Sequence, residues 1–182
     1  MLNASFVRTA GERDRIYVKR SDETEVGWAF PSYGDAPPHD LIHLVVESAF
    51  GLAWGFWGRV DAGADPGVIA AQANRQGGPD KYAGFGEDLS ELRLAEAVAN
   101  PRWLAEDTSL GELQEQIFGH CRDLGVAAPA LLSKERIGQV RVVLLRLARQ
   151  WRELAPKGAL RVSFDAKETV RGFEQLRGEP PK

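Results

Sequence analysis

The residues with the clearest chemical potential are two histidines and two carboxylates that recur along one short stretch of the chain. They are His39, Asp40, His43 and Glu47, in the pattern HDxxHxxxE. On a helix each residue advances by about 100°, so His39, His43 and Glu47 follow one another along one stripe. Imidazoles one turn apart can bind a single cation, and a carboxylate one turn further along can add an oxygen ligand or orient an imidazole. The pattern predicts a divalent-metal site with His39, His43 and Glu47 as its metal residues.

The first five residues of this stretch resemble the HExxH helix of zinc metalloproteases, in which both histidines bind zinc and the glutamate is the general base. The resemblance covers only His39 to His43, and Asp40 stands where the family has glutamate. It implies zinc as the first metal to test and Asp40 as a catalytic residue beside a metal-bound water. The pattern predicts a metal-dependent hydrolase. It does not predict proteolysis, because aspartate is one methylene shorter than the glutamate that is the general base in these proteases.

The same four residues also have a structural interpretation. The opposite arc of the helix is apolar, so both histidines lie at its margin, where half-buried imidazoles hydrogen-bond local backbone. His120, the third histidine, follows Ile117 in another predicted helix, from which it could approach the pair as a further ligand. Cys121 is the only cysteine and has no CxxC partner, so we expect it to be buried and unreactive.

The alternative to a metal site is a non-catalytic binding or assembly module. Either the aromatic segment 50–57 or the long helix 133–154 would make the contact. Core packing is the simpler use of the aromatic residues, because a sheet with one apolar face must be covered, and Trp28 is expected to pack against them. The arginines of the long helix do not form one row, so we expect them to lie on a solvated face with Glu135 and Glu153 as ion-pair partners.

Length and composition limit the architecture and the partners. A chain of 182 residues with 43% hydrophobic and 27% charged residues predicts one globular domain, placed at 1–177, with a disordered tail at 178–182. The net charge of -3 argues against nucleic acid, which would need a local basic patch. The absence of a leader pattern, of a long apolar run and of paired cysteines predicts no membrane contact and a cytoplasmic protein. Assembly into a homo-oligomer is compatible with these features.

These residues are positioned by a predicted α+β fold, a small antiparallel sheet covered on one face by five to six helices. Alternating apolar residues predict an N-terminal meander of three strands, over 6–9, 16–19 and 26–30, joined by a late strand at 160–164. Helical spacing with proline starts and glycine stops predicts helices over 38–50, 65–76, 89–99, 110–124 and 133–154, with a short helix after Asp165. A surface loop is predicted over 77–86.

Overall fold

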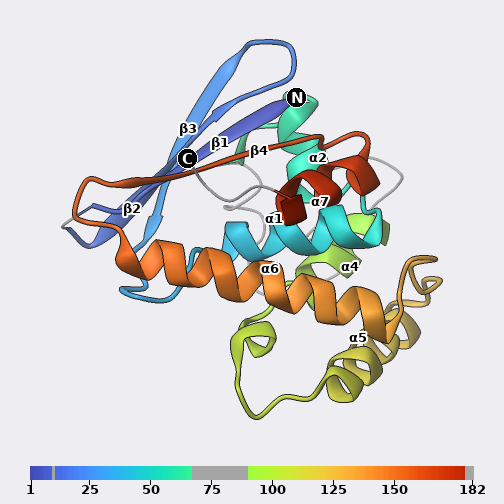
Figure 1. Ribbon diagram of the computed structural model, residues 1–182. Helices are drawn as coiled ribbons and strands as arrows, with labels where there is room; N and C mark the ends of the chain where they lie inside the picture. The colour runs from blue at the N-terminus through green and yellow to red at the C-terminus, as the bar shows by residue number, and fades with distance from the viewer. Residues whose placement is uncertain (10, 67–89, 179–182) are drawn as a thin grey trace.

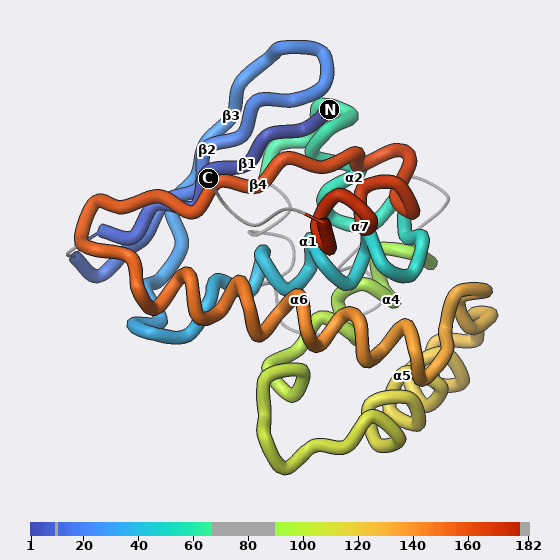
Figure 2. Tube along the Cα trace, viewed as in Figure 1, coloured from blue at the N-terminus to red at the C-terminus, as the bar shows by residue number. Residues whose placement is uncertain are grey.

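The computed structural model describes residues 1–9, 11–66 and 90–178 of the chain. Its sheet has four antiparallel strands in the order β3-β2-β1-β4, and Figures 1 and 2 show the helices gathered on one side of it. The strands are β1 (Leu2–Val7), β2 (Arg13–Lys19), β3 (Glu25–Pro31) and β4 (Ala159–Phe164). The late strand pairs with β1 from Leu2↔Phe164 to Val7↔Ala159, so the two ends of the chain share one sheet. The predicted α+β class is confirmed.

The strands form where apolar and polar residues alternate, since successive side chains point to opposite faces. In β2 the residues Asp14, Ile16 and Val18 are buried, whereas the residues between them are exposed. Partners in the register share a face, so Ile16 lies between Phe6 of β1 and Trp28 of β3 on the covered side. One face of the sheet therefore faces the helices, and no helix or strand of the described ranges covers the other, which we call the uncovered face.

The described residues contain six α-helices. They are α1 (His39–Phe50), α2 (Phe56–Asp61), α4 (Ser90–Val98), α5 (Leu110–Leu124), α6 (Lys134–Glu153) and α7 (Thr169–Gly178), and a 3₁₀ turn covers Pro101–Leu104. Gly51 ends α1 because its φ of 76° lies in the left-handed region, which a glycine adopts without strain. Ser109 and Glu112 begin α5 as a reciprocal capping box, as their spacing predicts.

Helix α6 supplies the central stripe of the core. Val140, Leu144 and Leu147 are each at most 4% exposed, and Trp151 at the end of the stripe is 1% exposed. Arg8 fixes that end of the helix to the sheet by donating from its guanidinium to the carbonyl of Arg152 at 2.9 Å. The long amphipathic helix predicted from spacings of three and four is therefore confirmed within one residue at each end.

The structure differs from the sequence expectations in two places. Strand β1 begins at Leu2, four residues before the predicted start, and Phe56–Asp61 forms a helix that the glycine-punctuated aromatic run does not predict. The predicted helix over 65–76 and the loop over 77–86 lie almost wholly outside the described residues, and so does the tail after Gly178. None of the helices in the described ranges combines the length and the apolar character needed to cross a membrane.

Candidate functional site

The four predicted site residues all lie on α1, the helix that runs through the middle of the molecule (Figure 1). Helix α1 is buried from Leu41 to Phe50 because α2, α4, α6 and α7 all pack around it. This packing includes the polar stripe, since His43 and Glu47 are each only 2% exposed, while His39 and Asp40 are half-buried. Polar groups this deep require hydrogen-bond partners, and the partners define the site.

Glu47 links α1 to α2 through both of its carboxylate oxygens. Its Oε1 accepts hydrogen bonds from the backbone N–H of Phe56 and from His43 Nδ1, and its Oε2 accepts from the N–H of Trp57, all at 2.9 Å. A carboxylate suits these first N–H groups of α2, which have no partner within the helix. Glycine at 55 makes room for this carboxylate, because a Cβ on Gly55 would lie 2.5 Å from Glu47 Cδ and one of the two would have to shift.

His43 lies between two carboxylates that come from different elements. Its Nδ1 is bound to Glu47 on α1, and its Nε2 lies 3.9 Å from Oε1 of Glu96 on α4. A separation of 3.9 Å is too long for a hydrogen bond. The imidazole is therefore oriented firmly from one side, and its second nitrogen faces a carboxylate across a short gap.

His39 and Asp40 flank this histidine and are themselves tied to the surrounding structure. His39 donates from Nε2 to the carbonyl of Ala99 at 2.6 Å, so its Nδ1 carries the lone pair. Its ring lies edge-on to that of His43, with ring centroids 4.7 Å apart. Asp40 accepts a hydrogen bond at Oδ2 from the indole N–H of Trp28 at 3.0 Å. The structure thus brings His39 and His43 together, as their spacing predicts.

Burial and neighbouring charges shift the pKa values of all four groups. Burial raises the pKa of Asp40 and of Glu47, against the opposing effect of their histidine and hydrogen-bonded neighbours. Burial alone would lower the pKa of His43, but the hydrogen bond and charge of Glu47, with the charges of Glu96 and Asp40, outweigh it and raise that pKa. Burial and the charge of His43 lower the pKa of His39. The carboxylates around His43 therefore favour its protonated form.

Glu96 belongs to this cluster although the sequence analysis does not single it out. It lies in the predicted helix 89–99, on the edge of a face that buries Leu92, Ala95 and Val98. A carboxylate beside a buried face is a weak signal on its own, and 53 residues separate it from His43. Only the packing of α4 against α1 brings the two side chains together.

The other candidate ligands remain apart from the cluster. His120 is half-buried on α5, and no hydrogen bond, ion pair or ring contact joins it to His39 or His43 in the described part of the chain. Cys121 is 4% exposed, and burial raises the pKa of its thiol, as expected for an unreactive cysteine. Within the described ranges, no three side chains of the His, Cys, Asp and Glu types already form a group that could hold a metal ion.

The aromatic segment lies against the same cluster. Phe50, Phe56 and Trp57 are buried, whereas Trp54 is 53% exposed. Trp28 packs against both Phe56 and Trp57 with ring centroids 6.0 Å apart, as the sequence predicts. Three of the four aromatic residues therefore belong to the core that surrounds the polar stripe.

Comparison with known proteins adds no relative to this description. No model of a protein family matches the chain, and neither the curated proteins nor the solved structures give a match.

Proposed function

We propose that the protein binds a divalent metal ion between Nε2 of His43 and the carboxylate of Glu96, with zinc as the first candidate. The observation that carries this proposal is the 3.9 Å separation of these two atoms. Two ligand atoms on one tetrahedral zinc, each about 2.1 Å from the metal, lie about 3.4 Å apart. A contraction of roughly 0.5 Å would suffice, and Glu96 has the freedom for it because its side chain is 24% exposed.

The environment of His43 supports this role. A metal-binding imidazole usually donates its other N–H to a carboxylate, which fixes the ring and makes the free nitrogen more basic. Glu47 has this position on Nδ1. Both oxygens of Glu47 already accept hydrogen bonds, so we assign it the orienting role and not that of a ligand.

The charge balance of the cluster also favours a cation. Asp40, Glu47 and Glu96 carry three negative charges when ionised, and at most two imidazoles are present to balance them. A divalent ion would offset the remaining charge at a place where burial makes bare carboxylates costly. Nδ1 of His39 and Oδ1 of Asp40 have no hydrogen-bond partner among the described residues, so one of these side chains would have to turn towards the ion to complete the coordination.

Hydrolysis by a metal-bound water, with Asp40 as its base, stays a prediction that depends on the metal. Asp40 is suited to this role in one respect, because burial raises its pKa and so makes it a stronger base than an exposed aspartate. It is restrained in another respect, since the indole of Trp28 holds one of its oxygens.

The second candidate function is a non-catalytic binding module, in which the cluster serves only to join α1, α2 and the sheet. The observation that favours it is that each of the four predicted residues already has a hydrogen-bond partner: His39 has Ala99, Asp40 has Trp28, and His43 and Glu47 have each other. Metal content distinguishes the two candidates.

The test is metal binding by the untagged chain, measured by elemental analysis and by thermal melts with and without zinc. At a zinc concentration 100 times the Kd, the stabilisation is about 2.7 kcal/mol, which corresponds to a rise of about 5–10 °C in Tm. Glu96→Gln should abolish the rise and stay folded, because Glu96 accepts no hydrogen bond from the described residues of the core.

His120→Gln is the matched control, since it removes a half-buried histidine away from the cluster and should leave the zinc response intact. A zinc response that survives in both Glu96→Gln and His43→Gln, or no response in the wild type, would overturn the proposal and favour the binding module.

A further inference from the structure

The uncovered face of the sheet has a composition different from the rest of the molecule. Its cationic residues are Arg13, Arg15 and Lys19 of β2 and Arg161 of β4, whereas Glu25 is the acidic residue that the four strands place on this face. The chain as a whole has a net charge of -3. The fold therefore separates charge and gives this face an excess of positive charge.

Two of these cations have no partner among the described residues. Neither Arg15 nor Arg161 has an ion pair or a side-chain hydrogen bond there, and both are exposed. Lys19 by contrast pairs with Glu23, and Arg13 donates to the carbonyl of Ala29 at 2.8 Å. Arg15 and Arg161 are thus available to bind an anion.

Tyr17 lies between these cations and presents its ring to solvent. The ring packs over the edge strand at Gly27, where a Cβ would lie 3.0 Å from Tyr17 Cδ1. The side chain is nevertheless 49% exposed, which is unusual for an aromatic residue in the middle of a sheet. Glycine at 27 lets the ring lie against the strand and leaves one aromatic face open.

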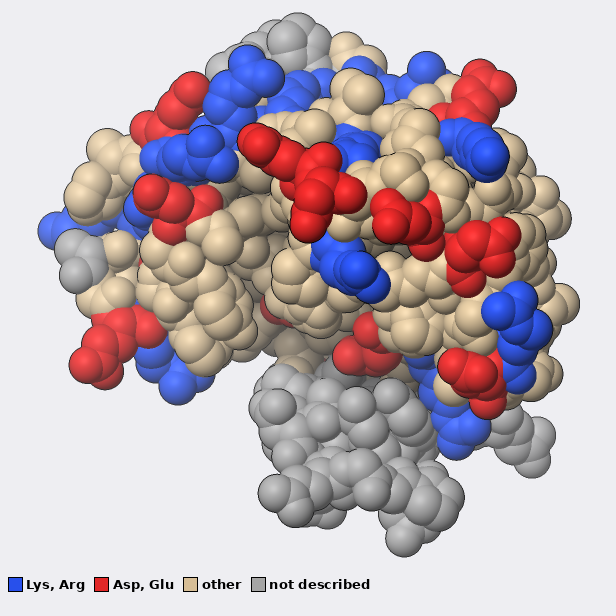
Figure 3. Space-filling view, turned by 90° about the horizontal axis from the view of Figure 1, so that it is seen from below, with Lys and Arg blue, Asp and Glu red and all other residues tan. Residues whose placement is uncertain are grey.

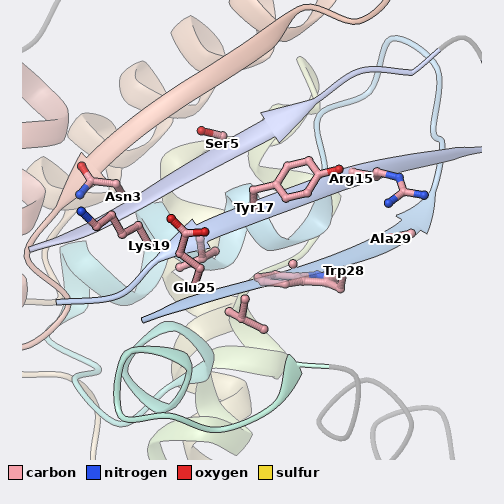
Figure 4. Close-up of a pocket in the computed structure, with 11 residues that line it drawn as sticks. Asn3, Ser5, Arg15, Tyr17, Lys19, Glu25, Trp28 and Ala29 are labelled. Carbon is pink, nitrogen blue, oxygen red and sulfur yellow. The ribbon is translucent and has the colours of Figure 1, made fainter. Parts of the chain in front are cut away.

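The register places these groups in a regular array. Gly27, Tyr17, Ser5 and Arg161 form one row across the four strands. Along β2, Arg15 and Lys19 flank Tyr17 at about 7 Å on either side, because a strand rises about 3.4 Å per residue. Figure 4 shows Asn3, Ser5, Tyr17 and Lys19 around the cavity of about 640 Å³ that opens over this face.

We propose that this face binds single-stranded nucleic acid, with a base stacked on Tyr17 and the phosphates held by Arg15, Arg161 and Lys19, whose exposed ion pair with Glu23 would open for the phosphate. Single strands bind to open surfaces that combine aromatic rings with a cationic track, because every base has a stacking face and every nucleotide a phosphate. The polar side chains of Asn3 and Ser5 beside the ring can hydrogen-bond base edges. A duplex offers no unstacked base and fits the array poorly.

The arginines of α6 do not provide a comparable surface. Arg141 donates to the carbonyls of Ala105 and Thr108, and Arg146 donates to that of Leu176, so both hold the helix to its neighbours. Arg136 pairs with Glu174 and lies over the ring of Phe173, in place of the predicted partners Glu135 and Glu153. On the face seen from below, acidic and basic side chains are interspersed (Figure 3).

The test is fluorescence anisotropy with labelled single-stranded RNA and DNA octamers and a hairpin duplex of RNA, in buffer that contains EDTA. Chelator separates this proposal from the metal site, so either can fail alone. Single strands should bind with a Kd of about 1–100 μM at low salt, and log K should fall with log salt with a slope of about −2 for three phosphate contacts. The duplex should bind at least about tenfold more weakly.

The variants identify the surface. Tyr17→Ala should weaken binding about tenfold, and Tyr17→Phe should retain it, since stacking needs only the ring. Arg15→Gln and Arg161→Gln should each make the slope of log K against log salt less steep by about 0.7. All three positions are on the exposed face, so the four variants should keep the wild-type Tm.

Two matched controls remove the same groups elsewhere. Tyr33→Ala deletes an exposed tyrosine that stacks on Phe30, and Arg149→Gln removes an exposed arginine of α6. Neither should change the affinity. The proposal is overturned if these controls lose as much affinity as the variants of the surface, or if the duplex binds as tightly as the single strands. It is also overturned if single strands do not bind at 100 μM protein, which is about the highest Kd expected.

Discussion

Replacement of Glu47 by alanine tests how much the polar cluster contributes to the stability of the fold. The carboxylate accepts three hydrogen bonds at 2.9 Å, from His43 Nδ1 and from the backbone N–H groups of Phe56 and Trp57, and it is 2% exposed. A buried donor left without an acceptor costs about 1–3 kcal/mol. Three such donors set a cost of at least about 3 kcal/mol, a large part of the usual 5–15 kcal/mol of folding stability.

The measurement is urea denaturation followed by tryptophan fluorescence, because Trp57 adjoins the site of the change. Glu47→Gln keeps one of the two acceptor oxygens, so it should lose less stability than Glu47→Ala. Both variants should be compared in the presence of chelator, which removes any contribution from bound metal.

Glu112→Ala is the matched control for this experiment. Glu112 also accepts a hydrogen bond from a backbone N–H, that of Ser109 at 2.7 Å, but it does so on the surface. Loss of this capping interaction should cost about 1 kcal/mol, since water can replace the carboxylate. If Glu47→Ala costs no more than Glu112→Ala, the buried donors of α2 find other partners and the reasoning is refuted.

Three further outcomes follow from burial, close packing and charge. Leu144→Ala should lower the free energy of unfolding by about 2–5 kcal/mol, because the side chain is 1% exposed; a loss below 0.5 kcal/mol, the size expected for a surface change, in urea melts would contradict this. Gly55→Ala should destabilise the protein in the same melts, because its Cβ would collide with Glu47; an unchanged midpoint would show that Glu47 moves aside freely. Stability should fall as pH rises above about 6.5, and His43→Gln should flatten this slope.

The sign of this pH dependence follows from the direction of the shift. The folded-state pKa of His43 lies above its unfolded value, so its proton stabilises the fold below about 6.5 and this contribution is lost as pH rises through the folded pKa. Glu47, Glu96 and Asp40 are the charged groups that face it. The lowered pKa of His39 acts in the opposite direction, because protonation of that ring below its ordinary pKa opposes folding. Stability melts from pH 5 to 9, near and above the ordinary histidine pKa, on wild type and His43→Gln would detect the difference.

The sequence by itself determined most of the described elements and the faces that they bury. Alternation in β2 and spacings of three and four in α6 predict which side chains are buried. The hydrophobic effect favours burial of those side chains whatever the topology. The pattern HDxxHxxxE likewise determined that His39 and His43 would be neighbours, because a helix fixes side chains one turn apart. These are local consequences of backbone geometry.

Only the tertiary structure decided what these residues meet. The gap between His43 and Glu96 exists because α4 packs on α1. Glu47 accepts hydrogen bonds from Phe56 and Trp57 because a short helix that the sequence did not predict begins next to it. The cationic face around Tyr17 arises because β4 pairs with β1 and so adds Arg161 to the row that contains Ser5 and Tyr17. Such contacts join residues far apart in the chain, and their geometry is set by the packing of whole elements, which no local pattern records.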